Sequence, residues 1–240
     1  MDAGPPFQTT AAPDALIDHA QSIAYWKSVS ADTNGMLGGV PQISRIDLQG
    51  SSNFLVKVRR SKPQPTKRPL PPLNRVADCG AGVGRITTGF LLNVSRTVDI
   101  VEPVTKFTDN LANRKEGRGQ VGQIISLGLQ DWRPEVGAYN AIWHQWCLGH
   151  LTDRQLVEYF KRCKEGLVKE GPAWIVVKEN MSTDIGKRDI FDEIDSSVTR
   201  ADEKYRSLFR EAGLKVVASE LQRGFPRGLY PVRMYALRPE

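Results

Sequence analysis

Side chains that bind metals or form disulfides are scarce in this sequence of 240 residues, which contains three cysteines and three histidines. Cys79, Cys147 and Cys163 are an odd number without CxxC spacing, and the histidines do not join them in a metal-ligand pattern. The sequence therefore predicts neither a disulfide scaffold nor a zinc site, and we expect a function that uses no metal.

Long apolar runs are missing as well. The longest candidates are short segments such as residues 174–177, whereas a membrane helix needs about 20 apolar residues. Residues 1–13 have neither the basic start nor the apolar stretch of a secretory signal. We therefore expect a protein without a membrane partner that works in the cytoplasm and also in the nucleus. We also expect it to be a monomer.

The composition is that of a globular protein, with 40% hydrophobic and 25% charged residues, which excludes a chain that is disordered, collagenous or coiled-coil throughout. The net charge of +6 would attract nucleic acid. Six basic residues, however, lie between Lys57 and Arg68, in a run that merges with five prolines between Pro63 and Pro72. This pattern favours a solvated linker over a nucleic-acid patch, so the function is not expected to require nucleic acid.

The basic, proline-rich run divides the chain into an N-terminal helical extension (1–57), a linker (58–74) and a body (75–240). In the extension, Asp14 is the expected cap of an amphipathic helix that continues to Lys27. The glycine-rich stretch 33–39 comes next and suits either a loop that covers a substrate or an ordinary surface loop.

The body has a regular alternation of strand and helix patterns. Short apolar runs predict buried strands at 75–79, 98–102, 123–126, 138–143 and 173–178. The best-marked helix begins with a capping box, formed by Thr152 and Gln155, and is stopped by Gly171. Two further strands, 214–219 and 233–237, have no helix between them and should form an antiparallel hairpin. We therefore predict a Rossmann-like α/β fold, with a mostly parallel seven-stranded sheet and helices on both of its faces.

The most informative local pattern is the segment from Asp78 to Arg85, between the first predicted strand and a helix. Glycines at 80, 82 and 84 let the backbone turn sharply and approach a ligand closely. A dinucleotide-binding fingerprint needs a glycine where Arg85 stands, whereas an acid followed by GxGxG is typical of S-adenosylmethionine methyltransferases. Glu102 ends the second strand, where a carboxylate can accept both ribose hydroxyls of either cofactor. A dinucleotide site and a purely structural glycine turn stay open at this point.

Several segments outside this motif are more distinctive. They are Tyr25-Trp26, Gly35 to Gly39, Ile43 to Asp47, Ser51 to Leu55, Gly128 to Asp131, Ile142-Trp143, Gln145-Trp146, Gly149 to Asp153, Lys178 to Asn180 and Asp195 to Val198. Together with the glycine motif, they make nearly the whole chain similar to the α-N-terminal protein methyltransferase family. Members of that family methylate the amino terminus of proteins that begin, after removal of methionine, with X-Pro-Lys or X-Pro-Arg. The resemblance implies a class I methyltransferase fold, S-adenosylmethionine as cofactor, and substrates that include ribosomal proteins.

The resemblance also implies roles for individual residues. Cofactor binding is implied for Gly80, Gly82, Arg85, Glu102, Leu129, Gln130 and Gln145. Substrate binding is implied for Trp26, Leu37, Trp146, Asn180, Asp192, Ser197 and Tyr230. Asp195 and His150 are the candidates for orienting the substrate amine and accepting its proton. Glu102 stands where better-known members have aspartate, and the longer acid can make the same bidentate contact.

These residue types fit the implied chemistry. An α-amine has a pKa of about 7.7 to 8.0, so it must lose a proton before its nitrogen can attack a methyl group. The carboxylate of Asp195 and the imidazole of His150 are side chains that can accept such a proton. Asp192 would pair with the basic third residue of the substrate. An apolar channel for the proline ring would be formed by Trp26, Leu37 and Trp146.

Each residue also has a structural interpretation when it is taken alone. Trp26 and Trp146 could be core aromatics, His150 could be a hydrogen-bonding residue at a helix start, and Asp195 could cap a helix. Two other functions are kept as alternatives: a small-molecule N- or O-methyltransferase on the same fold, and a weakly catalytic adaptor that binds ribosomes or RNA.

Overall fold

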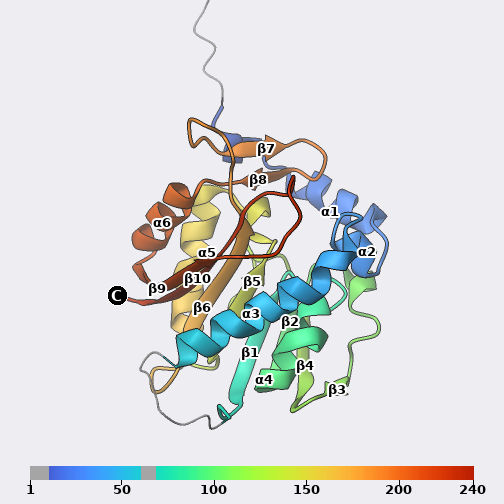
Figure 1. Ribbon diagram of the computed structural model, residues 1–240, viewed down its shortest axis with the longest axis vertical. Coiled ribbons are helices and arrows are strands. Elements are labelled where there is room, and N and C mark those ends of the chain that lie inside the picture. Colours follow the sequence, from blue (N-terminus) through green and yellow to red (C-terminus); the bar gives the residue numbers. More distant parts are fainter. Residues whose placement is uncertain (1–10, 61–68) are drawn as a thin grey trace, which may run out of the picture.

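An eight-stranded sheet forms the centre of the computed structural model, which describes residues 11–60 and 69–240 (Figure 1). The strand order is β3-β4-β2-β1-β5-β6-β10-β9. The strands are β1 (Leu73–Cys79), β2 (Ser95–Val101), β3 (Lys115–Glu116), β4 (Gly119–Ile125), β5 (Ala141–Gln145), β6 (Trp174–Asn180), β9 (Leu214–Leu221) and β10 (Val232–Pro239). A separate two-stranded ribbon consists of β7 (Ile190–Asp192) and β8 (Ser197–Thr199).

The middle of the sheet is parallel, as the buried apolar runs predicted. Strands β4, β2, β1, β5 and β6 pair in parallel, while β10 pairs antiparallel with both β6 and β9. Cys79 is level with Val101 and His144, and Gln145 is level with Lys178. The carboxyl ends of four strands therefore meet at one edge of the sheet, which is where ligands bind in folds of this type.

The sheet has one strand more than the predicted seven within the described residues. The additional strand, β3, pairs antiparallel with β4 through Lys115 and Glu116. Gly117 allows this tight return because its φ of 59° is open to glycine without strain. A strand of two residues shows no alternation of apolar and polar side chains, so β3 could not be predicted from the sequence.

Helices cover both faces of the sheet (Figure 1). They are η1 (Pro13–Leu16), α1 (His19–Ser28), α2 (Thr33–Met36), η2 (Pro41–Ile43), α3 (Ser44–Arg59), η3 (Thr87–Leu91), α4 (Leu92–Val94), η4 (Thr105–Phe107), η5 (Leu148–His150), α5 (Asp153–Gly166) and α6 (Asp202–Glu211). Trp143 and Val176 belong to the core under α3, and their neighbours Ile142 and Ile175 belong to the core under α5 and α6. This alternation along β5 and β6 separates two hydrophobic cores.

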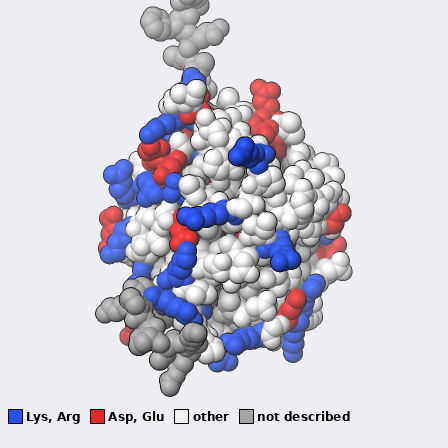
Figure 2. Space-filling model, viewed as in Figure 1, with Lys and Arg blue, Asp and Glu red and all other residues white. Residues whose placement is uncertain are grey.

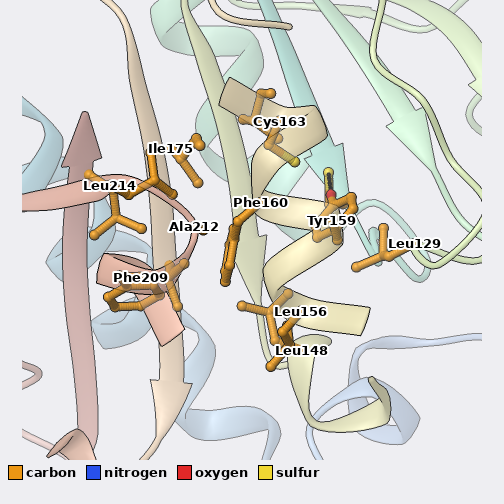
Figure 3. Close-up of a cluster of buried hydrophobic side chains, with 14 of the residues drawn as sticks. Leu129, Leu148, Leu156, Tyr159, Phe160, Cys163, Ile175, Phe209, Ala212 and Leu214 are labelled. Carbon is orange, nitrogen blue, oxygen red and sulfur yellow. Dashed lines mark hydrogen bonds between the residues drawn. The ribbon is translucent and has the colours of Figure 1, made fainter. Parts of the chain in front are cut away.

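Aromatic side chains fill the core under α5 and α6 (Figure 3). Phe160 of α5 meets Phe209 of α6 edge to face, with ring centroids 5.4 Å apart. Tyr159 and Cys163 point from the same helix toward the sheet, and both are fully buried. The three cysteines of the chain are free thiols in this interior, and burial raises the pKa of Cys79 well above its ordinary value. Cys79 therefore serves as a small packing residue under the glycine loop.

The first helix of the extension begins later than predicted. Asp18 caps α1 and accepts hydrogen bonds from the backbone of Ala20 and Gln21 at 2.8 and 3.2 Å. Asp14, the expected cap, instead accepts from the backbone N–H of Asp153 at 3.0 Å, in the first turn of α5. The correction has a simple physical reason, because a carboxylate stabilises any helix N-terminus that it can reach, including a distant one.

Other boundaries also differ from the expectations. The capping box of Thr152 and Gln155 is confirmed, but α5 ends at Gly166 rather than near Gly171. The helix after the glycine loop contains a π-helical stretch over residues 87–91. Helix α3 continues to Arg59, so the expected end of the extension at residue 57 falls inside it. The middle of the predicted linker, residues 61–68, lies outside the described residues.

No helix in residues 11–60 or 69–240 is both long and apolar enough to cross a membrane.

A buried histidine lies beneath the sheet edge. His144 is 0% exposed, and its Nδ1–H donates to the Val176 carbonyl at 3.0 Å while Nε2 accepts from the Tyr159 hydroxyl at 2.8 Å. The carbonyl can only accept, so this neutral tautomer is fixed. Burial lowers the pKa of His144 to about 4.

We expect His144 to make the fold sensitive to acid. Above pH 6.5 the histidine is neutral in both states; below it the unfolded chain takes up a proton that the folded chain refuses until about pH 4. The folded state should therefore lose about 3 kcal/mol of stability over this range. Urea unfolding of the wild type and His144→Gln, measured from pH 7 to pH 4, should give a difference in free energy that shrinks with falling pH. Parallel curves would contradict this assignment.

Candidate active site

Two adjoining cavities lie at the carboxyl ends of the parallel strands. The first cavity, of about 340 Å³, is enclosed by the glycine loop after β1, the ends of β2 and β5, the turn at 128–130 and one side of α1. The second cavity, of about 260 Å³, lies between α2, the ends of β5 and β6, strand β8 and the segment 225–232. Trp26, Met36, Trp146 and His150 line both cavities and form the wall between them. A ligand in one cavity therefore meets a ligand in the other at these four side chains.

The glycine loop gives the first cavity its floor. Gly80, Gly82 and Gly84 have φ values of 64°, 53° and 74°, which side chains with a Cβ rarely adopt. A Cβ on Gly80 would lie 2.4 Å from Cβ of Cys147 in the loop after β5. The acid that precedes the motif, Asp78, does not line the cavity. It accepts a hydrogen bond from the Thr87 hydroxyl at 2.5 Å and fastens the loop to η3. Burial raises the pKa of Asp78 to about 7.

Glu102, at the end of β2, presents its carboxylate to the first cavity. Oε2 accepts from the backbone N–H of Gly82 and Oε1 from that of Val104, both at 2.8 Å. These bonds fix the carboxylate, and each oxygen keeps a lone pair for a further donor such as a ribose hydroxyl. Burial raises the pKa of Glu102. Across the cavity, Leu129 and Gln130 lie in a turn whose carbonyls accept from Arg162 of α5 at 3.1 and 2.9 Å.

Arg85 and Gln145 complete the predicted set on the first cavity. Both are held by a residue to which the sequence assigned no role, Asp47 of α3. Nη1 of Arg85 donates to Asp47 at 2.7 Å, and Nε2 of Gln145 lies 2.8 Å from both carboxylate oxygens. In the sequence, Asp47 stands four residues before Ser51 and eight residues before Leu55, which places it on the buried face of α3. A charged side chain on a buried helix face needs a buried partner, so this spacing is the feature of the sequence that could have identified Asp47.

The second cavity collects most of the residues expected on the substrate side. Its lining includes Trp26, Leu37, Trp146, Asn180, Ser197 and Tyr230, together with both acid–base candidates, Asp195 and His150. Asp192 is not part of the lining. It lies exposed at the β7–β8 turn, where Oδ1 accepts from the backbone N–H of Ile194 at 2.8 Å. Met36, Val40, Phe225 and Leu229 add apolar walls that the sequence analysis did not assign.

The glycine-rich stretch 33–39 takes part in the enclosure. Asp32 caps α2 by accepting from the backbone N–H of Gly35 at 2.8 Å. The helix ends with Met36 on the wall between the cavities and Leu37 on the second cavity. The stretch therefore contributes side chains to the walls of both cavities.

His150 is tied to α1 through both ring nitrogens. The indole N–H of Trp26 donates to Nε2 at 3.1 Å, and Ser22 Oγ lies 2.8 Å from Nδ1. An indole only donates, so Nε2 carries no proton and Nδ1–H donates to Ser22. Burial lowers the pKa of His150, and the nearby negative charge of Asp195 offsets part of this shift. In this arrangement the imidazole is neutral and its basic nitrogen is already engaged.

Asp195 differs from His150 in having a free acceptor. Its Oδ1 is buried and has no hydrogen-bond partner, although the side chain lines the second cavity. Asp195 lies in the turn between β7 and β8 rather than at a helix start, which removes the interpretation as a helix cap. The next residue, Ser196, has a φ of 55° and accepts from the backbone N–H of Asp18 at 2.7 Å. The strained turn is thus fastened to the start of α1, with the Asp195 side chain on the cavity and one of its carboxylate oxygens unsatisfied.

The second cavity has acidic but no basic side chains among its described lining residues. Glu179 and Asp195 line it, and none of its described lining residues is a lysine or arginine. Glu179 accepts from the backbone of Cys147 and Leu148 at 2.9 Å, and burial raises its pKa to about 7. On the face shown in Figure 2, basic side chains are spread among acidic and uncharged ones. A cationic group would therefore be drawn to the cavity although the protein as a whole is basic.

We expect the first cavity to lose its ligand when Glu102 is neutralised. In Glu102→Gln, an amide N–H would face the backbone N–H of Gly82 or Val104, which displaces the side chain. Titration calorimetry should show affinity for S-adenosylhomocysteine reduced about tenfold or more. The exposed Glu116→Gln is the matched control and should bind normally. Equal affinity in Glu102→Gln would remove Glu102 from the site.

Comparisons with known proteins agree with the resemblance in the sequence. A family model described as AdoMet dependent proline di-methyltransferase matches residues 14–238. Alpha N-terminal protein methyltransferase 1 of Schizosaccharomyces pombe is 44% identical over 92% of this chain and 96% of its own length. N-terminal Xaa-Pro-Lys N-methyltransferase 1 of Mus musculus is 41% identical over 92% of this chain and 95% of its own.

Solved structures share the fold. A SAM-dependent methyltransferase from Leishmania major is 34% identical, with a TM-score of 0.78 over 91% of this chain and 82% of its own. The 1,6-didemethyltoxoflavin-N1-methyltransferase of Burkholderia thailandensis, determined with S-adenosylhomocysteine, is 18% identical with a TM-score of 0.65 and covers 100% of this chain and 94% of its own. The class I methyltransferase fold and the S-adenosylmethionine cofactor are thereby confirmed. The chain belongs to the family of AdoMet-dependent proline di-methyltransferases.

Proposed function

We propose that this enzyme methylates the α-amino group of proteins whose mature N-terminus reads X-Pro-Lys or X-Pro-Arg. The observation that carries the proposal is the unpartnered, buried Oδ1 of Asp195 in a second cavity that adjoins the cofactor cavity. The names of relatives that match nearly the whole chain support the same substrate class. They also favour a peptide over the small molecules considered as alternative substrates.

The residues of the first cavity fit S-adenosylmethionine. Glu102 would hold the ribose hydroxyls, Leu129 and Gln130 would flank the adenine, and Arg85 with Gln145 would face the methionine end. Gly80 and Gly82 would leave space for the cofactor beside the backbone. When bound, the cofactor supplies a methyl group that its sulfonium has already activated.

The acceptor amine arrives largely protonated at neutral pH. Asp195 would orient the ammonium group and accept its proton, since its free oxygen is the unsatisfied acceptor in the cavity. With that proton on Asp195, the amine would present a free lone pair to the methyl group that the bound cofactor supplies. Leu37 and Trp146 would enclose the substrate proline, and Asn180 would fix the substrate backbone. Asp192, exposed at the β7–β8 turn, would pair with a long basic third side chain.

His150 has a different role in this proposal. Its Nε2 already accepts from Trp26, so taking a proton there would break the contact that holds α1 in place. We therefore assign proton acceptance to Asp195 and positioning to His150, which fixes Trp26 and Ser22 at the wall between the cavities.

We further propose that ribosomal proteins are among the substrates, and that the enzyme acts as a monomer in the cytoplasm and the nucleus. Ribosomal proteins are basic polypeptides, and the acidic lining of the second cavity suits a cationic tail.

The proposed function has a direct test. The purified enzyme and S-adenosylmethionine are incubated with a peptide that begins Ser-Pro-Lys and with the same peptide acetylated at its N-terminus. Mass spectrometry should show added methyl groups on the free peptide alone, because acetylation removes the basic lone pair of the α-amine. No transfer to either peptide, with S-adenosylhomocysteine still bound, would contradict the proposal.

The division of roles between Asp195 and His150 predicts different kinetics for their variants. Asp195→Asn should lower kcat about 100-fold or more while cofactor binding persists, because the amide cannot accept the proton. His150→Gln should lower kcat about tenfold, through looser placement of Trp26. The exposed Asp109→Asn serves as the control. If His150→Gln proves as inactive as Asp195→Asn, the imidazole takes part in the proton transfer.

A further inference from the structure

A cluster of buried charged side chains lies directly behind the first cavity. Its centre is Asp47 of α3, which is 0% exposed. Besides Arg85 and Gln145, this carboxylate contacts the Lys178 ammonium of β6, with Nζ 2.6 Å from Oδ1. Lys178 is also 0% exposed. The cluster thus joins the extension, the glycine loop and two strands of the sheet at one point.

The charges within this cluster do not balance. One carboxylate, Asp47, faces two cations, Arg85 and Lys178. The nearby Asp78 is turned to Thr87, and its pKa of about 7 leaves it only partly charged at neutral pH. A surplus buried cation is costly unless an anion completes the group. Arg85 lines the first cavity, so an anionic group of a bound ligand can supply the missing charge.

Lys178 extends the same cluster toward the second cavity. Its Nζ donates to the Asp47 carbonyl and to Ser51 Oγ, each at 3.0 Å, and to Gln222 Oε1 at 2.8 Å. Gln222 begins the segment that carries Phe225, Leu229 and Tyr230 to the wall of the second cavity.

The approach of Gln222 to α3 depends on a glycine. A Cβ on Gly50, in the middle of α3, would lie 2.1 Å from Gln222 Oε1. Glycine weakens a helix interior by about 1 kcal/mol relative to alanine. Its presence here leaves the space through which Gln222 reaches Lys178.

We infer that Asp47 and Lys178 are positioning residues that serve both cavities. Asp47 orients Arg85 and Gln145 toward the carboxylate of the cofactor, and Lys178 supplies the positive charge that this carboxylate balances. Through Gln222, Lys178 also holds the segment 222–231 in place for the substrate; this second part rests on the proposed function. The N-terminal extension therefore prepares the cofactor site as well as covering it.

The cofactor side of the inference is tested by two ligands that share a nucleoside. S-adenosylhomocysteine carries the carboxylate, whereas 5′-methylthioadenosine lacks the whole amino-acid end. In Asp47→Asn, affinity for S-adenosylhomocysteine should fall about tenfold or more, while affinity for methylthioadenosine changes less than about twofold. Gln49→Ala, exposed on the same helix, is the control and should bind both ligands normally.

Lys178→Met provides a second variant in case Asp47→Asn does not fold. It removes the surplus charge and should lower the affinity for S-adenosylhomocysteine alone. Equal weakening of both ligands in whichever variant folds would mean a general structural role and would overturn the inference. These measurements contain no peptide, so their outcome does not depend on whether the enzyme methylates protein N-termini.

The substrate side is tested by Gln222→Ala and Gly50→Ala. Each should raise KM for the Ser-Pro-Lys peptide about threefold to tenfold and leave S-adenosylhomocysteine affinity unchanged, because the cofactor side of Asp47 is intact. An unchanged KM in both variants would overturn the link to the second cavity. If the peptide is not a substrate at all, the proposed function fails, while the cofactor result stands independently.

Discussion

The docking of the N-terminal extension onto the sheet is the constraint on which both cavities depend. Phe54, Leu55 and Val58 of α3 are buried against the sheet, and burial of such side chains is worth roughly 1.5 to 3 kcal/mol each. An apolar stripe alone would tolerate a shift along the helix. The buried carboxylate of Asp47 removes that freedom, because it satisfies Arg85, Gln145 and Lys178 only in one position. The apolar face supplies the affinity of α3 for the sheet, and the polar cluster supplies its register.

Helix α1 also depends on polar contacts for its position, because it buries little apolar surface and makes many hydrogen bonds. Asp18 reaches Ser196, Ser22 reaches His150, and Gln21 donates to the Glu193 carbonyl at 2.6 Å. Each partner lies in the β7–β8 turn or in the loop after β5, where the functional side chains are found. The helix is therefore positioned at the site mainly by hydrogen bonds rather than by a buried apolar face.

The body of the fold was predictable because its signals are local. The parallel strands are apolar runs that can be recognised without knowing which strands they pair with. The glycine loop can be recognised from the spacing of its own glycines. The predictions were wrong or incomplete where the role of a residue depends on a partner far away in the sequence. Asp14 and Asp18 are both plausible helix caps, and only the folded chain shows that Asp14 accepts from a backbone N–H in the first turn of α5. The tautomer of His150 depends on Trp26, 124 positions away, so no local pattern could separate its role from that of Asp195.

The wall between the cavities shows why the extension and the body have to be positioned so accurately. Trp26 and Met36 come from the extension, while Trp146 and His150 come from the loop after β5. Enzymes with unrelated acceptors can share the class I fold and its cofactor cavity. The Burkholderia thailandensis methyltransferase, at 18% identity, shares this fold with the chain. Selectivity for an acceptor must then come from elements added to the sheet. Methyl transfer requires the acceptor nitrogen and the donor to be aligned within a fraction of an ångström, so the anchors of those added elements are as necessary to catalysis as the side chains that touch the ligands.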